Sequence, residues 1–96
     1  MIDFELLPSS RLEYAEAFQW YAEQSLVAAE RFAMEIEAAF EAIRRNPDLY
    51  PRWNDTYQFY LLKKFPYFVA YRQANELVVI VAIRHSSQDQ DAWKGR

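Results

Sequence analysis

The chain has 96 residues, and we expect one domain over residues 1–96, because two domains would each be too small to hold a core. Its 52% hydrophobic and 18% aromatic residues exclude intrinsic disorder, no apolar run is long enough for a transmembrane helix, and one glycine excludes glycine-rich phosphate loops. The net charge of −3 argues against an ordinary basic nucleic-acid binder, but it divides into −6 for residues 1–48 and +3 for residues 49–96.

The N-terminal segment predicts a strand followed by a helix. Residues 2–7 alternate apolar and acidic side chains, which is typical of a short half-buried strand, and Pro8 is expected to end it. Ser10 and Glu13 have the spacing of a capping box, so a helix is expected to begin near residue 11.

A second helix is predicted after Ser25, which suits either a break or a second helix cap. Asn46 and Pro47 are expected to end this helix, because the residue before a proline disfavours the α conformation. The apolar residues between them recur every three or four positions and predict a face buried against a sheet. The largest of them are Phe32, Ile36, Phe40 and Ile43.

The second half of the chain changes to a period of two. A proline-rich loop over residues 47–56 precedes predicted strands at 57–64, 67–73 and 76–84, whose short connections predict an antiparallel meander. The polar tail after residue 85 has one large apolar residue, Trp93. The predicted fold class is therefore α+β, a two-layer sandwich with an N-terminal strand, a helical hairpin and a three-stranded meander packed on the helices.

Three other features have ordinary structural interpretations. Trp20 and Tyr21 are adjacent on a helix, so one should pack inward and the other lie near the surface, where aromatic residues anchor interfaces. Trp53 is expected to cover the core from its loop, and Lys63 and Lys64 to lie at a solvated strand end. No acidic or histidine cluster has metal-ligand spacing, and no metal or cofactor is expected.

The order of elements and the sequences within them resemble the RelE/ParE family of type II toxin–antitoxin toxins. The matching features are Trp20-Tyr21 in the first helix, NPDLYP at 46–51, FPYFVAY at 65–71, and VVIVAIRH at 78–85 before the tail. Together they span residues 11–96, and the ordered set carries the resemblance more than any one motif.

The resemblance implies a small toxin that a cognate antitoxin neutralises, with two possible mechanisms. ParE-like members inhibit DNA gyrase by binding, whereas RelE-like members cleave mRNA on the ribosome. RNA cleavage requires a base, an acid and cations around the scissile phosphate. At the corresponding nuclease positions this chain has the residues Phe59, Leu61, Phe68, Ser87 and Trp93. This pattern favours the ParE-like mechanism, and the chain is expected not to be an enzyme.

Two alternatives stay open. One is a RelE-like nuclease that uses His85 with Arg72 and Arg84 as catalytic residues and acts on ribosome-bound mRNA. The other is a degenerate toxin that retains only antitoxin binding, because Ser87, Gln88 and Gln90 stand where the family tail has two arginines and a proline.

The expected binding residues follow from the resemblance. They are His85, Trp93, Lys94 and Arg96 for the target, and Trp20 and Tyr21 for the antitoxin. The absence of cysteine and of a signal peptide predicts a cytoplasmic location, and no membrane partner is expected. A homodimer or a toxin–antitoxin hetero-oligomer is the expected assembly.

Overall fold

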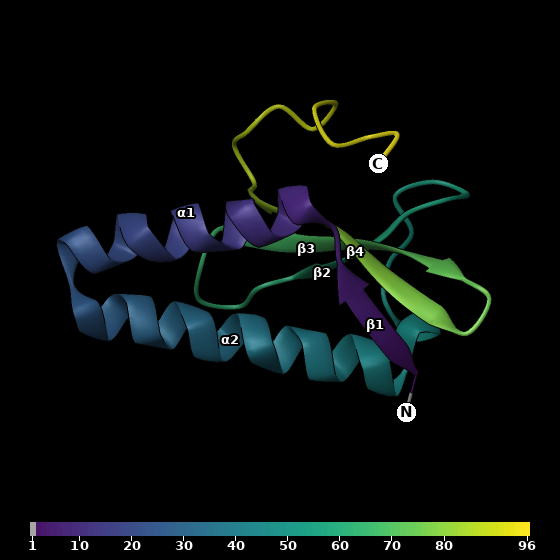
Figure 1. Ribbon diagram of the computed structural model, residues 1–96, viewed down its shortest axis with the longest axis horizontal. Coiled ribbons are helices and arrows are strands. Elements are labelled where there is room, and N and C mark those ends of the chain that lie inside the picture. Colours follow the sequence, from purple (N-terminus) through teal and green to yellow (C-terminus); the bar gives the residue numbers. More distant parts are fainter. Residues whose placement is uncertain (1) are drawn as a thin grey trace.

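The computed structural model describes residues 2–96 and contains two long helices and a four-stranded sheet (Figure 1). The elements in chain order are β1 (Asp3–Leu6), α1 (Pro8–Gln24), α2 (Leu26–Arg45), a short 3₁₀ helix η1 (Pro47–Leu49), β2 (Gln58–Leu61), β3 (Tyr67–Ala74) and β4 (Leu77–His85). No helix within residues 2–96 has both the length and the apolar character that crossing a membrane requires.

The sheet has the strand order β1-β4-β3-β2. β2, β3 and β4 form the predicted antiparallel meander, and β1 adds to its far edge in parallel with β4. The β3–β4 register shifts between Ala70 and Tyr71, which face Ala82 and Ile80 and leave Val81 as the extra residue of a bulge. The predicted α+β class and its strand–hairpin–meander order are confirmed.

The beginning of α1 differs from the prediction. The helix starts at Pro8, whose fixed φ and missing N–H suit the first helical turn, so the proline begins the helix and Leu6 ends the strand. Ser10 does not form a capping box, because its buried hydroxyl lies 2.8 Å from the Leu7 carbonyl and 3.0 Å from the Ile80 carbonyl, to which it donates. This contact attaches the first turn of α1 to β4.

α2 confirms the predicted second cap and the buried face. The Ser25 hydroxyl accepts a hydrogen bond from the Ala28 amide at 3.3 Å, as an N-cap residue should. The helix packs on the face of the sheet that α1 also covers (Figure 1). We call the apolar layer between helices and sheet the helix-side core; its largest fully buried members are Phe32, Ile36, Ile43, Val69, Tyr71, Val78, Ile80 and Ile83.

The opposite face of the sheet is also covered, by the loop before β2 and by the tail. We call this second layer the tail-side core; it contains Tyr57, Phe68, Ala70, Val79, Val81, Ala82 and Trp93, with Trp53, Phe59 and Leu77 partly buried against it. β4 is therefore buried on both faces, which explains its nearly uninterrupted apolar sequence. Trp53 covers this second core, in agreement with its predicted role.

β2 is shorter than predicted and ends at Leu61. Lys63 and Lys64 therefore lie in the β2–β3 connection, where the Glu35 carboxylate of α2 accepts hydrogen bonds from both of their backbone amides, at 3.0 Å for Lys64. A side chain thus satisfies amides that a longer strand would have paired. The β3–β4 turn contains Asn75 at φ 58°, a conformation that asparagine tolerates well.

Candidate functional site

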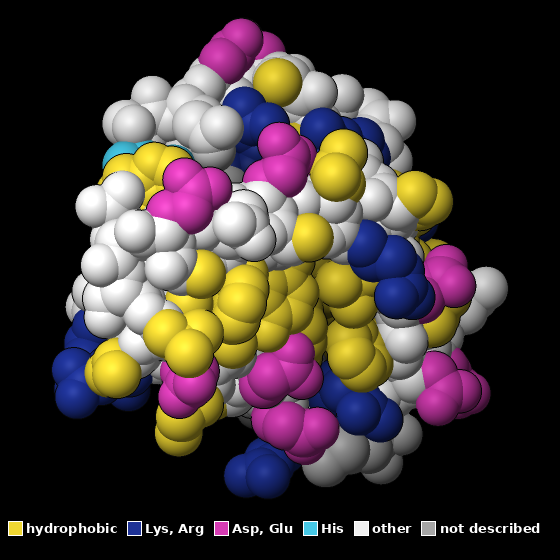
Figure 2. All heavy atoms as spheres, turned by 60° about the vertical axis from the view of Figure 1, so that its left-hand side comes forward, with side chains coloured by type: hydrophobic (Ala, Val, Ile, Leu, Met, Phe, Trp, Pro, Cys, Tyr) yellow, Lys and Arg dark blue, Asp and Glu magenta, His cyan; other side chains and the backbone are white. Residues whose placement is uncertain are grey.

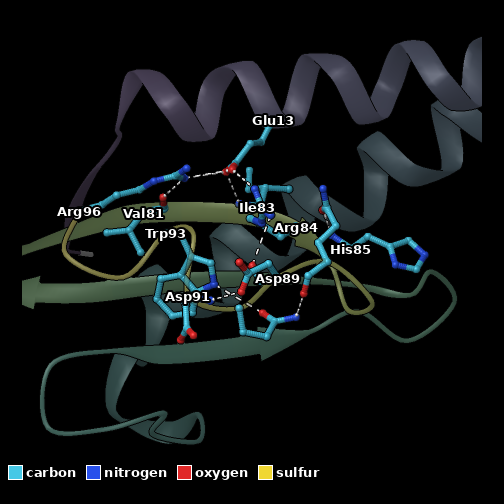
Figure 3. Close-up of polar contacts among 11 residues, drawn as sticks. Glu13, Val81, Ile83, Arg84, His85, Asp89, Asp91, Trp93 and Arg96 are labelled. Carbon is cyan, nitrogen blue, oxygen red and sulfur yellow. Dashed lines mark hydrogen bonds and ion pairs between the residues drawn. The ribbon is translucent and has the colours of Figure 1, made fainter.

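The C-terminal half of β4 lies at an open edge of the sheet. β1 pairs only with Leu77–Ile80, so the strand has no neighbour on that side from Val81 onward. Side chains occupy the edge instead: the Ile83 amide donates to Glu13 at 3.1 Å, and Arg96 donates to the Val81 carbonyl at 3.0 Å (Figure 3). An exposed strand edge is prone to non-native pairing, and these two contacts block it.

Glu13 connects this edge to the tail through two ion pairs. Its carboxylate lies 3.1 Å from Arg84 and 3.0 Å from Arg96. The three side chains are only 13%, 14% and 24% exposed, so solvent screens these pairs less than it would at the surface. Sequence reasoning assigned Glu13 to a helix cap and missed this role, because a carboxylate three residues after a serine fits both roles equally.

The tail is anchored by the aromatic ring of Trp93, which is fully buried. Its indole packs against Trp53, Tyr57 and Phe68, with ring centroids 5.3, 5.1 and 6.1 Å away. Trp93 was predicted to contact the target, but in this fold it is inside the molecule. Direct contact would require the tail to leave the sheet.

Polar contacts fix the last residues of the tail over the same core. The Tyr57 hydroxyl accepts from the Gly95 amide at 2.9 Å and donates to the Arg96 carbonyl at 3.3 Å. The Arg72 guanidinium donates to that carbonyl at 3.1 Å. Arg96, the second predicted target residue, therefore has both its backbone and its side chain engaged within the chain.

Lys94 is the accessible cation of the tail. Its ammonium pairs with Asp91 at 2.9 Å and lies 5.4 Å from the centroid of the Trp53 ring. The pair is exposed, and the lysine side chain can therefore exchange Asp91 for another anion at small energetic cost.

His85, the remaining predicted target residue, ends β4 with its ring half-buried against Tyr67, 5.2 Å between centroids. Its Nδ1 accepts a hydrogen bond from the Ser87 amide at 3.0 Å and lies 2.7 Å from the Ser87 hydroxyl. A backbone amide can only donate, so Nδ1 carries no proton and the neutral ring bears it on Nε2. In this tautomer His85 can donate a hydrogen bond from Nε2.

The structure does not bring together the three residues of the nuclease alternative. Tyr67 faces His85 across the β3–β4 ladder, whereas Arg72 lies five residues further along β3, which puts it ~17 Å away. Arg84 is adjacent to His85 in the chain but pairs with Glu13. No base with two cations around a common phosphate position is formed by these residues.

The residues at the nuclease positions lie in different surroundings. Phe68 is buried in the tail-side core and Phe59 packs against it. Leu61 is exposed at the end of β2, and Ser87 is an exposed partner of His85. Within the part of the chain that the structure describes, no group of three histidine, cysteine or acidic side chains is placed to hold a metal ion.

The two aromatic residues predicted for antitoxin binding point in different directions, as their adjacency required. Tyr21 packs in the helix-side core against Phe32, Phe65 and Tyr67. Trp20 is 57% exposed and lies beside Tyr67 and His85. The helical layer also has an open groove between α1, α2 and β1. Figure 2 shows hydrophobic side chains in a hollow on the helical side of the molecule, flanked by both acidic and basic ones.

Comparisons with known proteins agree on one family. The sequence model of the ParE toxin of type II toxin–antitoxin systems (parDE) matches residues 4–90. Two proteins called Toxin ParE2, from Mycobacterium tuberculosis strains CDC 1551 / Oshkosh and ATCC 25618 / H37Rv, are each 30% identical over 78 residues, covering 80% of this chain and 74% of theirs. A chain of a solved structure described as the chromosomal ParDE TA system from P. aeruginosa matches this one with a TM-score of 0.78 at 11% sequence identity. The match covers 88% of this chain and 96% of that chain, and it shows that the two have the same fold.

Proposed function

This chain belongs to the ParE toxin family of type II toxin–antitoxin systems, and from that premise we propose that it inhibits DNA gyrase by binding and is neutralised by a cognate antitoxin. The proposal needs no chemical step on the toxin. It requires one surface that contacts the target and another that the antitoxin covers.

The observation that carries the proposal is the state of His85. Its Nδ1 is occupied by Ser87, so the ring does not present a free lone pair to an RNA hydroxyl. The candidate cations are also unavailable, because Arg84 pairs with Glu13 and Arg72 lies at the other end of β3. General acid–base cleavage needs its groups within hydrogen-bond reach of one substrate, and these residues do not meet that condition.

The target-binding surface in this proposal is the end of β4 with the tail. His85 offers its Nε2–H and Lys94 its ammonium, both reachable from solvent. Trp93 and Arg96 act indirectly, since one anchors the tail in the core and the other fixes it to Glu13. The antitoxin is assigned to the helical side, where Trp20 is exposed.

A supercoiling assay with purified gyrase and purified toxin tests the proposal. We expect the wild-type chain at micromolar concentration to stop the conversion of relaxed plasmid to supercoiled plasmid. Replacing Lys94→Gln should weaken inhibition about tenfold, as loss of an interfacial charge does. Lys63→Gln is the matched control, because it removes the same charge from the β2–β3 connection, outside the proposed surface.

Unimpaired gyrase at micromolar toxin would contradict the proposed target. If cells then also grew normally when the chain was induced without an antitoxin, the chain would be a degenerate toxin that only binds its antitoxin. Equal loss of inhibition in the Lys94 and Lys63 variants would leave gyrase as the target but reject the tail as the contact surface.

A further inference from the structure

The C-terminal part of α1 presents an indole that the fold supports but does not cover. Trp20 is 57% exposed, and the Tyr21 ring packs against it edge-to-face, with centroids 5.0 Å apart and an interplanar angle of 88°. Tyr21 is itself held in the helix-side core. The indole is therefore held in place by a buried neighbour while most of its surface remains in water, a property of aromatic residues that dominate interfaces.

A hollow of about 460 Å³ adjoins Trp20, and its walls are largely aromatic. It is lined by Trp20, Tyr21, Pro66, Tyr67, His85 and Gln88. In Figure 2 the histidine, in cyan, lies beside hydrophobic side chains at the margin of the helical side. Burial raises the pKa of both tyrosine hydroxyls, which keeps them neutral, and neither has a hydrogen-bond partner among the described residues. The hollow can therefore accept a planar group and hydrogen-bond its edge.

Carboxylates flank the indole along the helix. Glu16 precedes Trp20 by four residues and Glu23 follows it by three, so all three share one face of α1. Neither carboxylate forms an ion pair within residues 2–96, although Glu23 accepts a 3.4 Å hydrogen bond from Gln19. The one basic residue of α1 is Arg11, near its other end. Arg84 and Arg96 line a hollow together with Glu16 and Trp20, but both guanidinium groups pair with Glu13. Glu16 and Glu23 are therefore carboxylates beside the indole without a cationic partner among the described residues, and they favour a cation over a phosphate group.

We propose that Trp20, Glu16 and Glu23 form a docking site for an arginine side chain of the antitoxin, an inference that rests on the proposed function. A guanidinium can stack on the indole while its N–H groups bind a carboxylate in bidentate fashion. Lysine fits less well, because its ammonium is a point charge that does not stack. The antitoxin segment that reaches this surface therefore carries an arginine, and its contact with Trp20 contributes much of the affinity.

The test uses the full-length chain and its full-length cognate antitoxin, with the dissociation constant measured by calorimetric titration. Trp20→Ala should weaken the complex about 30-fold or more, as loss of an interfacial hot spot does. Glu16→Gln with Glu23→Gln should weaken it about tenfold and reduce its salt dependence. Asp55→Asn with Glu76→Gln is the matched control, because it removes two exposed charges outside α1 and should change the constant less than twofold.

Replacing each antitoxin arginine by lysine in turn identifies the partner residue. One replacement should reproduce most of the Trp20→Ala loss and add little to it when the two changes are combined. Folding of each toxin variant is checked by its thermal unfolding, which replacement of this exposed side chain should leave unchanged. Wild-type affinity in the Trp20→Ala complex would overturn the inference, and a loss that no arginine replacement reproduces would overturn the arginine chemistry. Absence of any complex with the wild-type chain would instead contradict the proposed function.

Discussion

The two faces of the sheet are buried by different means. On the helix side, α1 and α2 cover the strands with apolar side chains at helical spacing, and Phe32, Ile36 and Ile43 are completely inaccessible. On the tail side, residues without regular secondary structure cover the strands, and a single ring, Trp93, fills the centre. The tail has few apolar contacts to hold it, so polar contacts to Glu13, Tyr57 and Arg72 complete its attachment.

Because the two faces are covered differently, changes in the helix-side core should affect stability, and changes on the tail side should affect binding. The helix-side core is continuous with the bulk of the fold, and it cannot open without unfolding the molecule. We expect the tail to leave the sheet as a local event, because its one large apolar anchor, Trp93, lies near its end. The proposed target-binding residues belong to this weaker cover or lie beside it, so changes there can alter binding while the helix-side core remains intact.

Phe32→Ala should have the largest effect on stability. The Phe32 ring contacts Tyr14, Tyr21, Phe65 and Tyr67, and the cavity left by its removal should cost about 4 kcal/mol of unfolding free energy. Urea denaturation at neutral pH measures it. Met34→Ala, an exposed residue of the same helix, should stay within about 0.5 kcal/mol. A loss below 1 kcal/mol for Phe32→Ala would show that the helix-side core is not the stronger of the two.

Trp93→Ala should cost less, about 3 kcal/mol, because the rest of the tail can detach locally and limit the penalty. Amide hydrogen exchange should then accelerate in the tail and at Val81 and Ile83 more than in α2. Uniform acceleration across the helices and the sheet would contradict a separately detachable cover.

Glu13→Gln should cost about 2 kcal/mol, since it leaves Arg84 and Arg96 without their shared carboxylate in a mostly buried place. Glu16→Gln, one turn later on α1 and exposed, is the matched control and should have almost no effect. A double-mutant cycle of Glu13→Gln with Arg96→Gln measures the coupling directly. Independent, fully additive effects of the two changes would mean that the ion pair does not hold the tail.

Tyr71→Phe should have the smallest effect, about 1 kcal/mol, because the Pro47 carbonyl loses the tyrosine hydroxyl but keeps the Gln58 side chain at 2.9 Å. Burial, with Tyr50 and Asp48 nearby, raises the pKa of Tyr71, and Arg52 lowers it to a smaller extent. A raised pKa stabilises the neutral form, so this contribution is present below pH 10 and is lost as the pH rises further. Urea midpoints between pH 8 and pH 11 should fall less steeply for Tyr71→Phe; identical slopes would contradict this account.

Periodicity was sufficient to predict the helix-side core, because its buried residues repeat at helical spacing on α2 and alternate on the strands. The change from helical spacing to alternation along the chain also predicted the order of the elements, and the short connections between the strands predicted the antiparallel meander. The start of α1 was predicted wrongly, since Ser10 with Glu13 satisfies the rule for a capping box although a distant strand uses both side chains. The early end of β2 depends on Glu35, about thirty residues earlier, and local sequence contains no sign of it.

The binding roles of the candidate site residues stay predictions, and the structure shows where their side chains lie. His85 and Lys94 lie where solvent reaches them, as a binding residue should. Trp93 and Arg96 were expected at the target, and their burial or pairing depends on tail contacts that no local pattern encodes. The adjacency of Trp20 and Tyr21 did predict that one is exposed, because neighbouring residues on a helix point apart.

We propose that this chain acts by binding gyrase rather than by cutting RNA. The most direct measurement follows plasmid supercoiling and mRNA 5′ ends in one culture, after induction of the wild-type chain without its antitoxin. We expect that plasmid DNA loses negative supercoils while the mRNA 5′ ends do not change. New ribosome-dependent mRNA 5′ ends that vanish with His85→Ala, in cells whose plasmids stay supercoiled, would contradict it.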